Sequence, residues 1–427
     1  MAWILFISFF ILLAAGVPVA FTLAISAFTA VAIGSSYPYL VVVKEMFSGL
    51  DSFPLMAVPF FILAAELMTG SAMTHVLLRF ASQFVGHLRG GLGYANVISS
   101  GLFAGISGSA LADAAGPGAV MIRMMEKSGY DKAYAGALTA TASVVGPIIP
   151  PSIIMIIYAL QVDQVSVGAL FMAGMIPGLL ILLALCAANF YVSRKRGYRG
   201  SEARPSAREI VKTSTHALPA LMLIVIIIGG IRGGVFTPTE ASVVAVFYAL
   251  ACGTLIYRSL RLRDLPAIVF RAALVSVAVL VILAAARAFA WVLIIEGVPQ
   301  TMADTIIGWE LSPIAFLLAI NVLLLIFGLF MDPLPGVMVL VPILAPIAHS
   351  LGIDPIHFAI IVILNLTFGL TTPPVGALLF VVSSAVQLRV SEIIRELPPF
   401  FIALMAVLLT ITFVPSLSTW LPRASGF

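Results

Sequence analysis

Long apolar stretches separated by short polar segments follow one another along the whole chain. They cover residues 2–33, 54–70, 92–122, 133–160, 166–192, 217–231, 235–257, 266–295, 311–348, 355–385 and 398–420. Most are at least as long as the roughly 20 residues with which a helix crosses a bilayer. Lipid accepts only helices and closed barrels, and these runs are too long and too uniformly apolar for barrel strands. The pattern predicts an all-α polytopic membrane protein.

The N-terminal segments leave alternatives open. A Gly-Val-Pro sequence at 16–18 either divides residues 2–33 into two short spans or kinks a single one. This first stretch lacks a basic start and a small-residue cleavage site, so we interpret it as a membrane segment and not as a signal peptide. The less apolar stretch 35–53 mixes charged and aromatic residues, which is typical of a helix lying on the membrane surface. It is either a contact for a partner or a plain surface linker.

Composition supports the membrane interpretation and narrows the chemistry. Of the 427 residues, 62% are hydrophobic and only 9% are charged, whereas soluble domains carry about 25% charged residues. The net charge of +4 lies in loops, where it orients the helices and does not indicate nucleic-acid binding. The two cysteines lie in apolar segments and the five histidines are scattered. We therefore expect no disulfide framework, no transition-metal site and no intramembrane enzyme.

Basic residues indicate which loops face the cytoplasm. The loop 193–216 is strongly basic, and basic clusters lie on both sides of the apolar segment 92–122. That segment must therefore enter and leave the membrane on one side, as a re-entrant hairpin that opens to the cytoplasm. The segments 296–310 and 349–355 contain no Lys or Arg. The apolar segment between them, 311–348, is the corresponding hairpin that opens to the periplasm.

A weak internal repeat relates the two halves. Residues 146–151, Gly-Pro-Ile-Ile-Pro-Pro, correspond to residues 369–374, Gly-Leu-Thr-Thr-Pro-Pro, at a distance of 223 positions. At the same distance Ser109, at the tip of the first hairpin, falls on Asp332. Each half thus contains a hairpin followed by a broken helix, and the charges give the halves opposite orientations. Unless these common Gly and Pro residues match by chance, the pattern indicates an inverted-repeat secondary transporter with its site where the broken helices meet.

The first hairpin tip, residues 105–113 (Gly-Ile-Ser-Gly-Ser-Ala-Leu-Ala-Asp), and the two breaks at 146–151 and 369–376 together resemble a known family. They are similar to the large membrane subunit of tripartite ATP-independent periplasmic (TRAP) transporters, and the similarity extends over essentially the whole chain. The resemblance implies an elevator-type fold of the ion-transporter superfamily in the bacterial inner membrane. It also implies symport with sodium as the coupling ion, with no other cofactor.

The resemblance implies partners as well. A small four-helix membrane subunit and a periplasmic substrate-binding protein would complete the tripartite complex. The substrate would be an organic acid, either a C4-dicarboxylate or a related carboxylate such as sialic acid. Because the first apolar segment leads directly into the repeat, we expect no fused small subunit. The expected division is first-repeat scaffold at 1–91, first transport elements at 92–165, further scaffold at 166–310, second transport elements at 311–390 and a C-terminal helix at 391–427.

A sodium site requires hard oxygen ligands, which carbonyl groups freed at helix breaks and Ser or Thr hydroxyls supply. Proline leaves a carbonyl unpaired within the helix, and glycine lets the backbone approach the ion. The first candidate sodium site joins Ser107, Gly108 and Ser109 with Gly146, Pro147 and Ile149. The second joins Gly328 and Asp332 with Thr371, Thr372 and Gly376. Symmetry suggests pairing each tip with the break of its own repeat; alternatively, Ser107 and Ser109 serve only close helix packing.

A carboxylate substrate requires positive potential, which the N-termini of the half-helices after Pro151 and Pro374 provide. The candidate substrate-binding residues are Ser107, Ser109, Pro150, Ser152, Thr371, Thr372 and Pro374. Ionisable residues inside apolar segments are further candidates, because their burial in lipid is costly. They are Glu66, Asp113, Glu240, Arg287 and Asp332.

Two of these ionisable residues have structural alternatives. We expect Arg287 to form a scaffold ion pair with Glu66 or Glu240, and the alternative is a substrate anchor. Asp113 lies about one helical turn beyond Ser109, so we expect it to cap or orient the tip without touching sodium. Two other functions stay open, namely a stand-alone sodium- or proton-coupled anion carrier of related fold and a passive channel.

Overall fold

The computed structural model describes residues 1–200, 204–308 and 311–427, and all regular secondary structure in these ranges is helical. Parts of two loops used in the charge argument lie outside the described residues, namely 201–203 and 309–310. Six described helices are long and apolar enough to cross a membrane, or up to nine if each of three bent pairs counts as one span. The prediction of an all-α polytopic membrane protein is confirmed.

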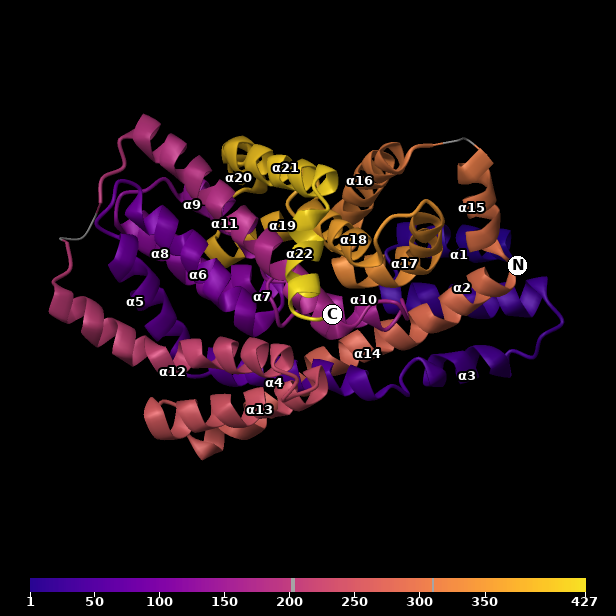
Figure 1. The fold of residues 1–427 in the computed structure, drawn as a ribbon, viewed down its shortest axis with the longest axis horizontal. Helices are drawn as coiled ribbons and strands as arrows, with labels where there is room; N and C mark the ends of the chain where they lie inside the picture. The colour runs from indigo at the N-terminus through magenta and orange to yellow at the C-terminus, as the bar shows by residue number, and fades with distance from the viewer. Residues whose placement is uncertain (201–203, 309–310) are drawn as a thin grey trace.

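The N-terminal part resolves the alternatives for residues 2–33. Its elements are α1 (Ala2–Ala14), α2 (Val19–Gly34), α3 (Leu40–Ser48), η1 (Phe53–Met56), α4 (Ala57–Thr69) and α5 (Met73–Val85). Gly16 has a left-handed backbone with φ +77°, and Pro18 caps the start of α2, so the chain turns and α1 packs against α2. The stretch 35–53 contains α3, whose axis is bent by 67° from that of η1 and α4. Figure 1 shows the N-terminus at the end of the molecule that holds α1 and α2.

The first predicted hairpin and broken helix form as expected; the hairpin is slightly longer than predicted and the broken helix is shifted by one residue. The hairpin comprises α6 (Gly91–Ser107), α7 (Ala110–Asp113), the π-helical turn η2 (Ala114–Gly118) and α8 (Ala119–Lys127). The broken helix comprises α9 (Lys132–Ser143) and α10 (Ile153–Ala159). Side-chain caps begin three of these helices, since Ser109, Asp131 and Ser152 each accept a backbone hydrogen bond from the first turn.

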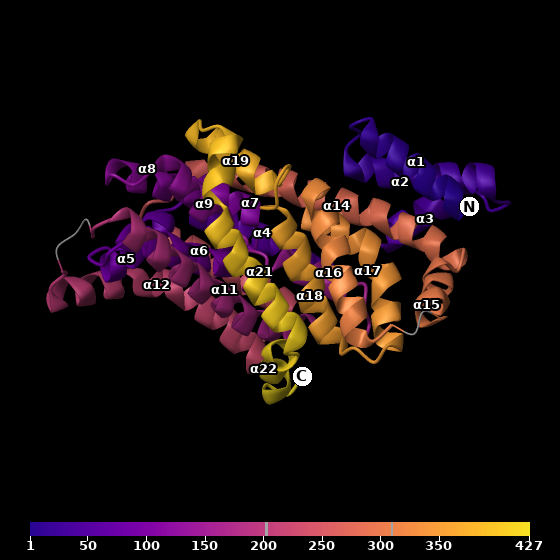
Figure 2. The same cartoon turned by 90° about the horizontal axis from the view of Figure 1, so that it is seen from above.

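The second repeat has the same order of elements. Its hairpin comprises α16 (Pro313–Phe330) and α17 (Pro333–Ser350), and its broken helix comprises α18 (Pro355–Gly369) and α19 (Ala377–Val386), followed by α20 (Val390–Glu396). Figure 2 shows α16, α17 and α18 side by side, with α21 (Pro398–Phe413) next to α18.

The remaining helices surround these repeats. They are α11 (Val167–Arg196), α12 (Ala207–Arg232), α13 (Pro238–Ala251) with the π turn η3 (Cys252–Ile256), η4 (Leu262–Asp264), α14 (Leu265–Ile295), α15 (Val298–Gly308) and α22 (Ser416–Ala424). In Figure 1, α12 and α13 pack against each other along one edge. The 31-residue α14 contacts α2, α3 and α4 on one side and α17 on another, so it connects the N-terminal helices with the second repeat.

The two repeats exchange their outer arms. The half-helix α10 of the first repeat packs on α17 of the second hairpin, while α19 of the second repeat packs on α7, η2 and α8 of the first hairpin. Buried amides join each hairpin to its own broken helix, through an Asn96–Thr139 bond of 2.6 Å and an Asn365–Asn321 bond of 2.7 Å. The hairpins and broken helices therefore form one interlocked body.

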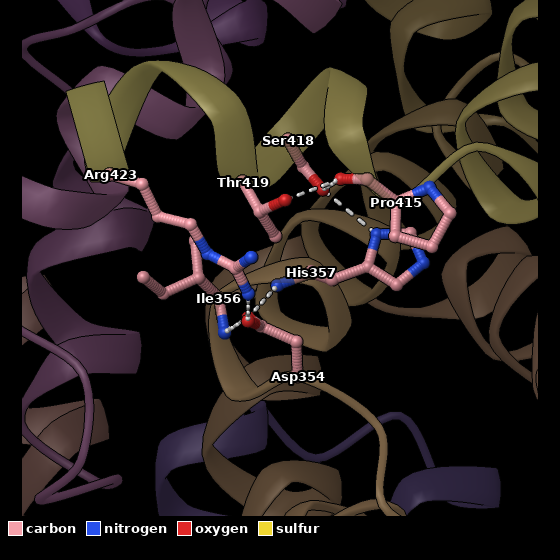
Figure 3. Close-up of polar contacts among 7 residues, drawn as sticks. All are labelled: Asp354, Ile356, His357, Pro415, Ser418, Thr419 and Arg423. Carbon is pink, nitrogen blue, oxygen red and sulfur yellow. Dashed lines mark hydrogen bonds and ion pairs between the residues drawn. The ribbon is translucent and has the colours of Figure 1, made fainter.

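The C-terminal helix α22 is fastened to the start of α18 (Figure 3). Asp354 accepts hydrogen bonds from the backbone N–H groups of Ile356 and His357, at 2.9 and 3.1 Å, and it pairs with Arg423 at 2.8 Å. His357 Nδ1 lies 2.8 Å from Ser418 Oγ. Asp354 thus caps one helix and holds another.

We expect Asp354→Ala to lower the apparent melting temperature more than Arg423→Ala. Loss of the helix cap costs about 1 kcal/mol, whereas an exposed ion pair contributes at most about 1 kcal/mol and often much less. The Arg423 side chain is 68% exposed. Thermal unfolding of the two variants in detergent measures the difference, and equal melting temperatures would show that the cap contributes nothing.

Candidate functional site

The first hairpin tip and the first helix break pack backbone against backbone. Gly108 turns the chain with φ +59°, and a Cβ atom placed on it would lie 2.8 Å from the carbonyl oxygen of Pro151. A Cβ atom on Gly146 would lie 3.0 Å from the carbonyl carbon of Ser109 and 3.1 Å from the nitrogen of Ala110. The structure therefore brings together the tip and the break of the same repeat.

Five of the six carbonyl groups of residues 146–151 accept no hydrogen bond from the described part of the chain, and those of Gly146 and Ile149 are among them. Among the described residues, the carbonyl oxygens of Gly146 and Ile149 accept no hydrogen bond, whereas that of Pro147 accepts one from Ser152 Oγ at 2.5 Å. Gly146 is buried and Ile149 is half-buried. Because an unpaired carbonyl group is costly away from water, a cation at this position would stabilise the break.

Asp113 and Ser107 complete the first tip. Ser107 Oγ donates to Asp113 Oδ1 at 2.6 Å and accepts from the backbone N–H of Ser109 at 3.2 Å. Asp113 thus orients the tip, as expected from its spacing. The structure adds something that the spacing did not predict, because the second carboxylate oxygen is buried without a hydrogen bond in the described structure. It faces the break, since a Cβ atom on Gly146 would lie 2.9 Å from it.

A small cavity adjoins this tip. Its volume is about 210 Å³, and its lining includes Ser107 and Asp113 from the hairpin and Glu66 and Thr69 from α4. The cavity therefore lies between the interlocked repeats and the N-terminal helices, and two of its polar residues belong to the tip.

The second tip and break also meet through glycine. A Cβ atom on Gly369 would lie 2.5 Å from the Cα atom of Gly328, so α16 and α18 cross in direct backbone contact. Thr371 and Thr372 both donate to the carbonyl of Phe368, at 2.9 and 3.0 Å. Their own carbonyl groups accept no hydrogen bond from the described part of the chain.

Two other members of the second candidate site have different neighbours. Gly376 begins α19 with φ +41°, and a Cβ atom there would lie 3.0 Å from the carbonyl oxygen of Thr372. Gly376 therefore packs against the backbone of its own break. Asp332 is exposed and caps α17 by accepting from Leu334 N at 3.1 Å. In the described structure it makes no hydrogen bond to the break.

The candidate substrate-binding residues differ in accessibility. Ser152 is fully buried, and its hydroxyl is engaged with Pro147 and with the backbone N–H of Met155. Pro150 and Thr371 are buried too, whereas Ser107, Ser109 and Thr372 are half-buried and Pro374 is exposed. The peptide bonds 150–151 and 373–374 are both cis, so the two breaks share their backbone form as well as their sequence pattern.

The expected ion pair of Arg287 is wrong. Glu66 pairs instead with Arg271 at 3.1 Å, and Glu240 completes a capping box with Thr237. Arg271 and Arg287 are sixteen positions apart on α14, which corresponds to about 24 Å along a helix. The register between α4 and α14, which the sequence pattern does not contain, decides which arginine reaches Glu66. Arg287 has no ion pair among the described residues, and its side chain is exposed.

Comparison with known proteins identifies relatives of this architecture. The family model "Tripartite ATP-independent periplasmic transporter, DctM component" matches residues 6–417. The sialic acid TRAP transporter large permease protein SiaM of Vibrio cholerae is 40% identical over 412 residues, which cover 96% of each chain. The C4-dicarboxylate TRAP transporter large permease protein DctM of Rhodobacter capsulatus is 36% identical over 97% of each chain.

A solved structure shares the fold at low sequence identity. The YdaH transporter of Alcanivorax borkumensis superposes with a TM-score of 0.61 at 13% identity, over 90% of this chain and 88% of that one. This similarity extends to the fold alone.

Proposed function

Since the chain belongs to the family of DctM components, the large permeases of TRAP transporters, we propose that it imports an organic acid by sodium symport. In this proposal it works in the bacterial inner membrane together with a small four-helix subunit and a periplasmic substrate-binding protein. The full-length relatives are named as transporter permeases and not as enzymes.

The substrate class follows from what the relatives share. One is named for sialic acid and the other for C4-dicarboxylates, and both compounds carry a carboxylate. We therefore assign a carboxylate to this chain, with a C4-dicarboxylate as the first compound to test. Discrimination among carboxylates would rest largely on the binding protein.

The observation that supports sodium coupling is the group of unpaired carbonyl groups at the first break. They include those of Gly146 and Ile149, and they lie in the segment that packs against the Ser109 tip. Carbonyl and hydroxyl oxygens are the ligands that alkali cations prefer in membrane proteins. The buried, unpaired oxygen of Asp113 adds a further candidate oxygen ligand beside Gly146. The second break would hold a second ion through the free carbonyls of Thr371 and Thr372.

The exchanged arms support an elevator movement. Because α10 packs on the second hairpin and α19 on the first, the two hairpins and two broken helices would move together as one body. The long helix α14, with the N-terminal helices packed along it, would form the stationary scaffold. Sodium bound at a break would order the tip and favour the anion electrostatically, and by linkage the anion would favour sodium equally.

Reconstitution in liposomes tests this function. The chain would be combined with its small subunit and binding protein, and uptake of labelled succinate and sialic acid would be followed with and without an inward sodium gradient. We expect uptake that requires both sodium and the binding protein. Sodium-driven uptake by the membrane chain alone would instead identify a stand-alone carrier, and uptake driven only by a proton gradient would refute the sodium sites.

A further inference from the structure

A second cavity lies away from both breaks. Its volume is about 620 Å³, and its walls are α14, α17, the segment after α3 and the connection between α10 and α11. None of the candidate residues of the hairpin tips and helix breaks lines it. Cavities of about 300–1,000 Å³ accommodate small-molecule ligands, so this one is large enough for a carboxylate of a few carbon atoms.

The cavity lining includes one cationic residue and two residues whose hydrogen-bond donors are buried. Arg287 lies in its wall with an exposed side chain, although its neighbours Ala286 and Ala288 are buried. Tyr158 is fully buried, and its hydroxyl makes no hydrogen bond among the described residues. The side-chain nitrogen of Gln161 is also buried without a hydrogen bond there. Buried polar groups normally have partners, so the two unpaired donors of Tyr158 and Gln161, in a lining that also contains Arg287, indicate a ligand with hydrogen-bond acceptors.

The rest of the lining fits a small organic anion. Leu283, Val341 and Ala345 supply apolar surface for a carbon chain. A guanidinium group binds a carboxylate through two parallel hydrogen bonds. The lining also includes Asp163 and His349, both exposed. The carboxylate of Asp163 repels other negative groups near it. A substrate carboxylate therefore binds at Arg287 and not next to Asp163.

The position of the cavity indicates when it would act. Arg287 belongs to α14, whereas Tyr158 and Val341 belong to α10 and α17 of the interlocked repeats. The lining includes residues of the 349–355 segment and of the segment after α14, which carry no Lys or Arg and face the periplasm by the charge rule. The cavity thus opens between scaffold and moving body, on the side where a periplasmic protein would release its ligand.

We propose that this cavity is a second carboxylate site, in which Arg287 binds the carboxylate and Tyr158 and Gln161 donate hydrogen bonds to it. In transport, this cavity receives the anion before the anion reaches the breaks. This role rests on the proposed function. Movement of the repeats against α14 would separate Tyr158 from Arg287, and the site would then be incomplete. Because its lining contains no break residue, it binds the anion without sodium.

Equilibrium binding in sodium-free buffer tests the site independently of transport. The probes are labelled succinate and sialic acid, added to the purified chain in detergent. We expect Arg287→Gln to weaken binding by about tenfold or more, as loss of a charge-assisted double hydrogen bond does. Arg287→Lys should recover part of it, and Tyr158→Phe should weaken binding by a smaller factor. The matched control is Arg271→Gln, which removes an arginine from the same helix outside the cavity.

The outcomes separate this proposal from the proposed function. If wild type binds neither probe without sodium, or if Arg287→Gln binds as tightly as Arg271→Gln, the second site is refuted even where sodium-driven uptake succeeds. If reconstituted wild type shows no sodium-driven uptake but Arg287-dependent binding persists, the proposed coupling fails and the site stands. In reconstituted uptake, Arg287→Gln should raise the half-saturating concentration of the loaded binding protein while leaving that of sodium unchanged.

Discussion

Replacing Gly146 by alanine should reduce sodium-driven uptake by about tenfold or more, since overpacking costs about 1–3 kcal/mol and each 1.4 kcal/mol is tenfold. The added methyl group would lie 2.9 Å from a carboxylate oxygen of Asp113 and 3.0 Å from the Ser109 backbone. The tip and the break would have to separate by a few tenths of an ångström. In the proposed sodium site this displacement moves carbonyl ligands away from the ion. The half-saturating sodium concentration should therefore rise, together with a moderate fall in melting temperature.

Gly116→Ala is the matched control for this substitution. Gly116 lies on the same hairpin, in η2, and a Cβ atom placed there would meet no atom within 4 Å. Uptake by Gly116→Ala should resemble that of the wild type. If Gly146→Ala takes up substrate with unchanged sodium dependence, the first break does not hold the coupling ion.

The sequence predicts the elements of the fold well because their signals are local. Apolar length, basic loops and the Gly-x-x-x-Pro-Pro breaks suffice to place both hairpins and both broken helices. The division of residues 2–33 depended on one backbone conformation, the left-handed Gly16. The pattern identified Gly and Pro as breakers but did not determine whether the chain would turn back on itself.

Features that depend on packing between distant segments could not be predicted. The exchange of α10 and α19 between the repeats is one of them, because a repeat in the sequence does not say which hairpin each arm contacts. The partner of Glu66 is another, since the register of α14 against α4 decides that Arg271 and not Arg287 reaches it. For the same reason the unpaired oxygen of Asp113 and the cavity around Arg287 became visible only in three dimensions. The candidate residues were selected by chemistry and local spacing, which do not determine which of them are buried or already bonded.

Replacing Gly369 by alanine should damage both transport and stability. The new methyl group would lie 2.5 Å from the Cα and carbonyl carbon atoms of Gly328, a distance that rigid backbone atoms do not tolerate. Helices α16 and α18 would have to move apart, and the neighbouring Asn365–Asn321 hydrogen bond of 2.7 Å would stretch with them. Close backbone contact through small residues is a main source of helix association in membranes. We expect a loss of about 1–3 kcal/mol or more, seen as a lower melting temperature together with reduced uptake.

Gly229→Ala provides the control for the Gly369 experiment, because Gly229 is also helical but a Cβ atom there would meet no atom within 4 Å. Alanine favours helix formation over glycine, so this variant should be as stable as the wild type or slightly more stable. The two glycine experiments then differ in what they report. Gly146→Ala should change the sodium dependence with the smaller fall in melting temperature, because its closest clash is 2.9 Å to a side-chain oxygen, whereas Gly369→Ala clashes with backbone atoms at 2.5 Å and should lower the melting temperature more. If Gly369→Ala melts like Gly229→Ala, the second hairpin and the second broken helix do not depend on this glycine contact, and the interlocked body described above is held by other contacts.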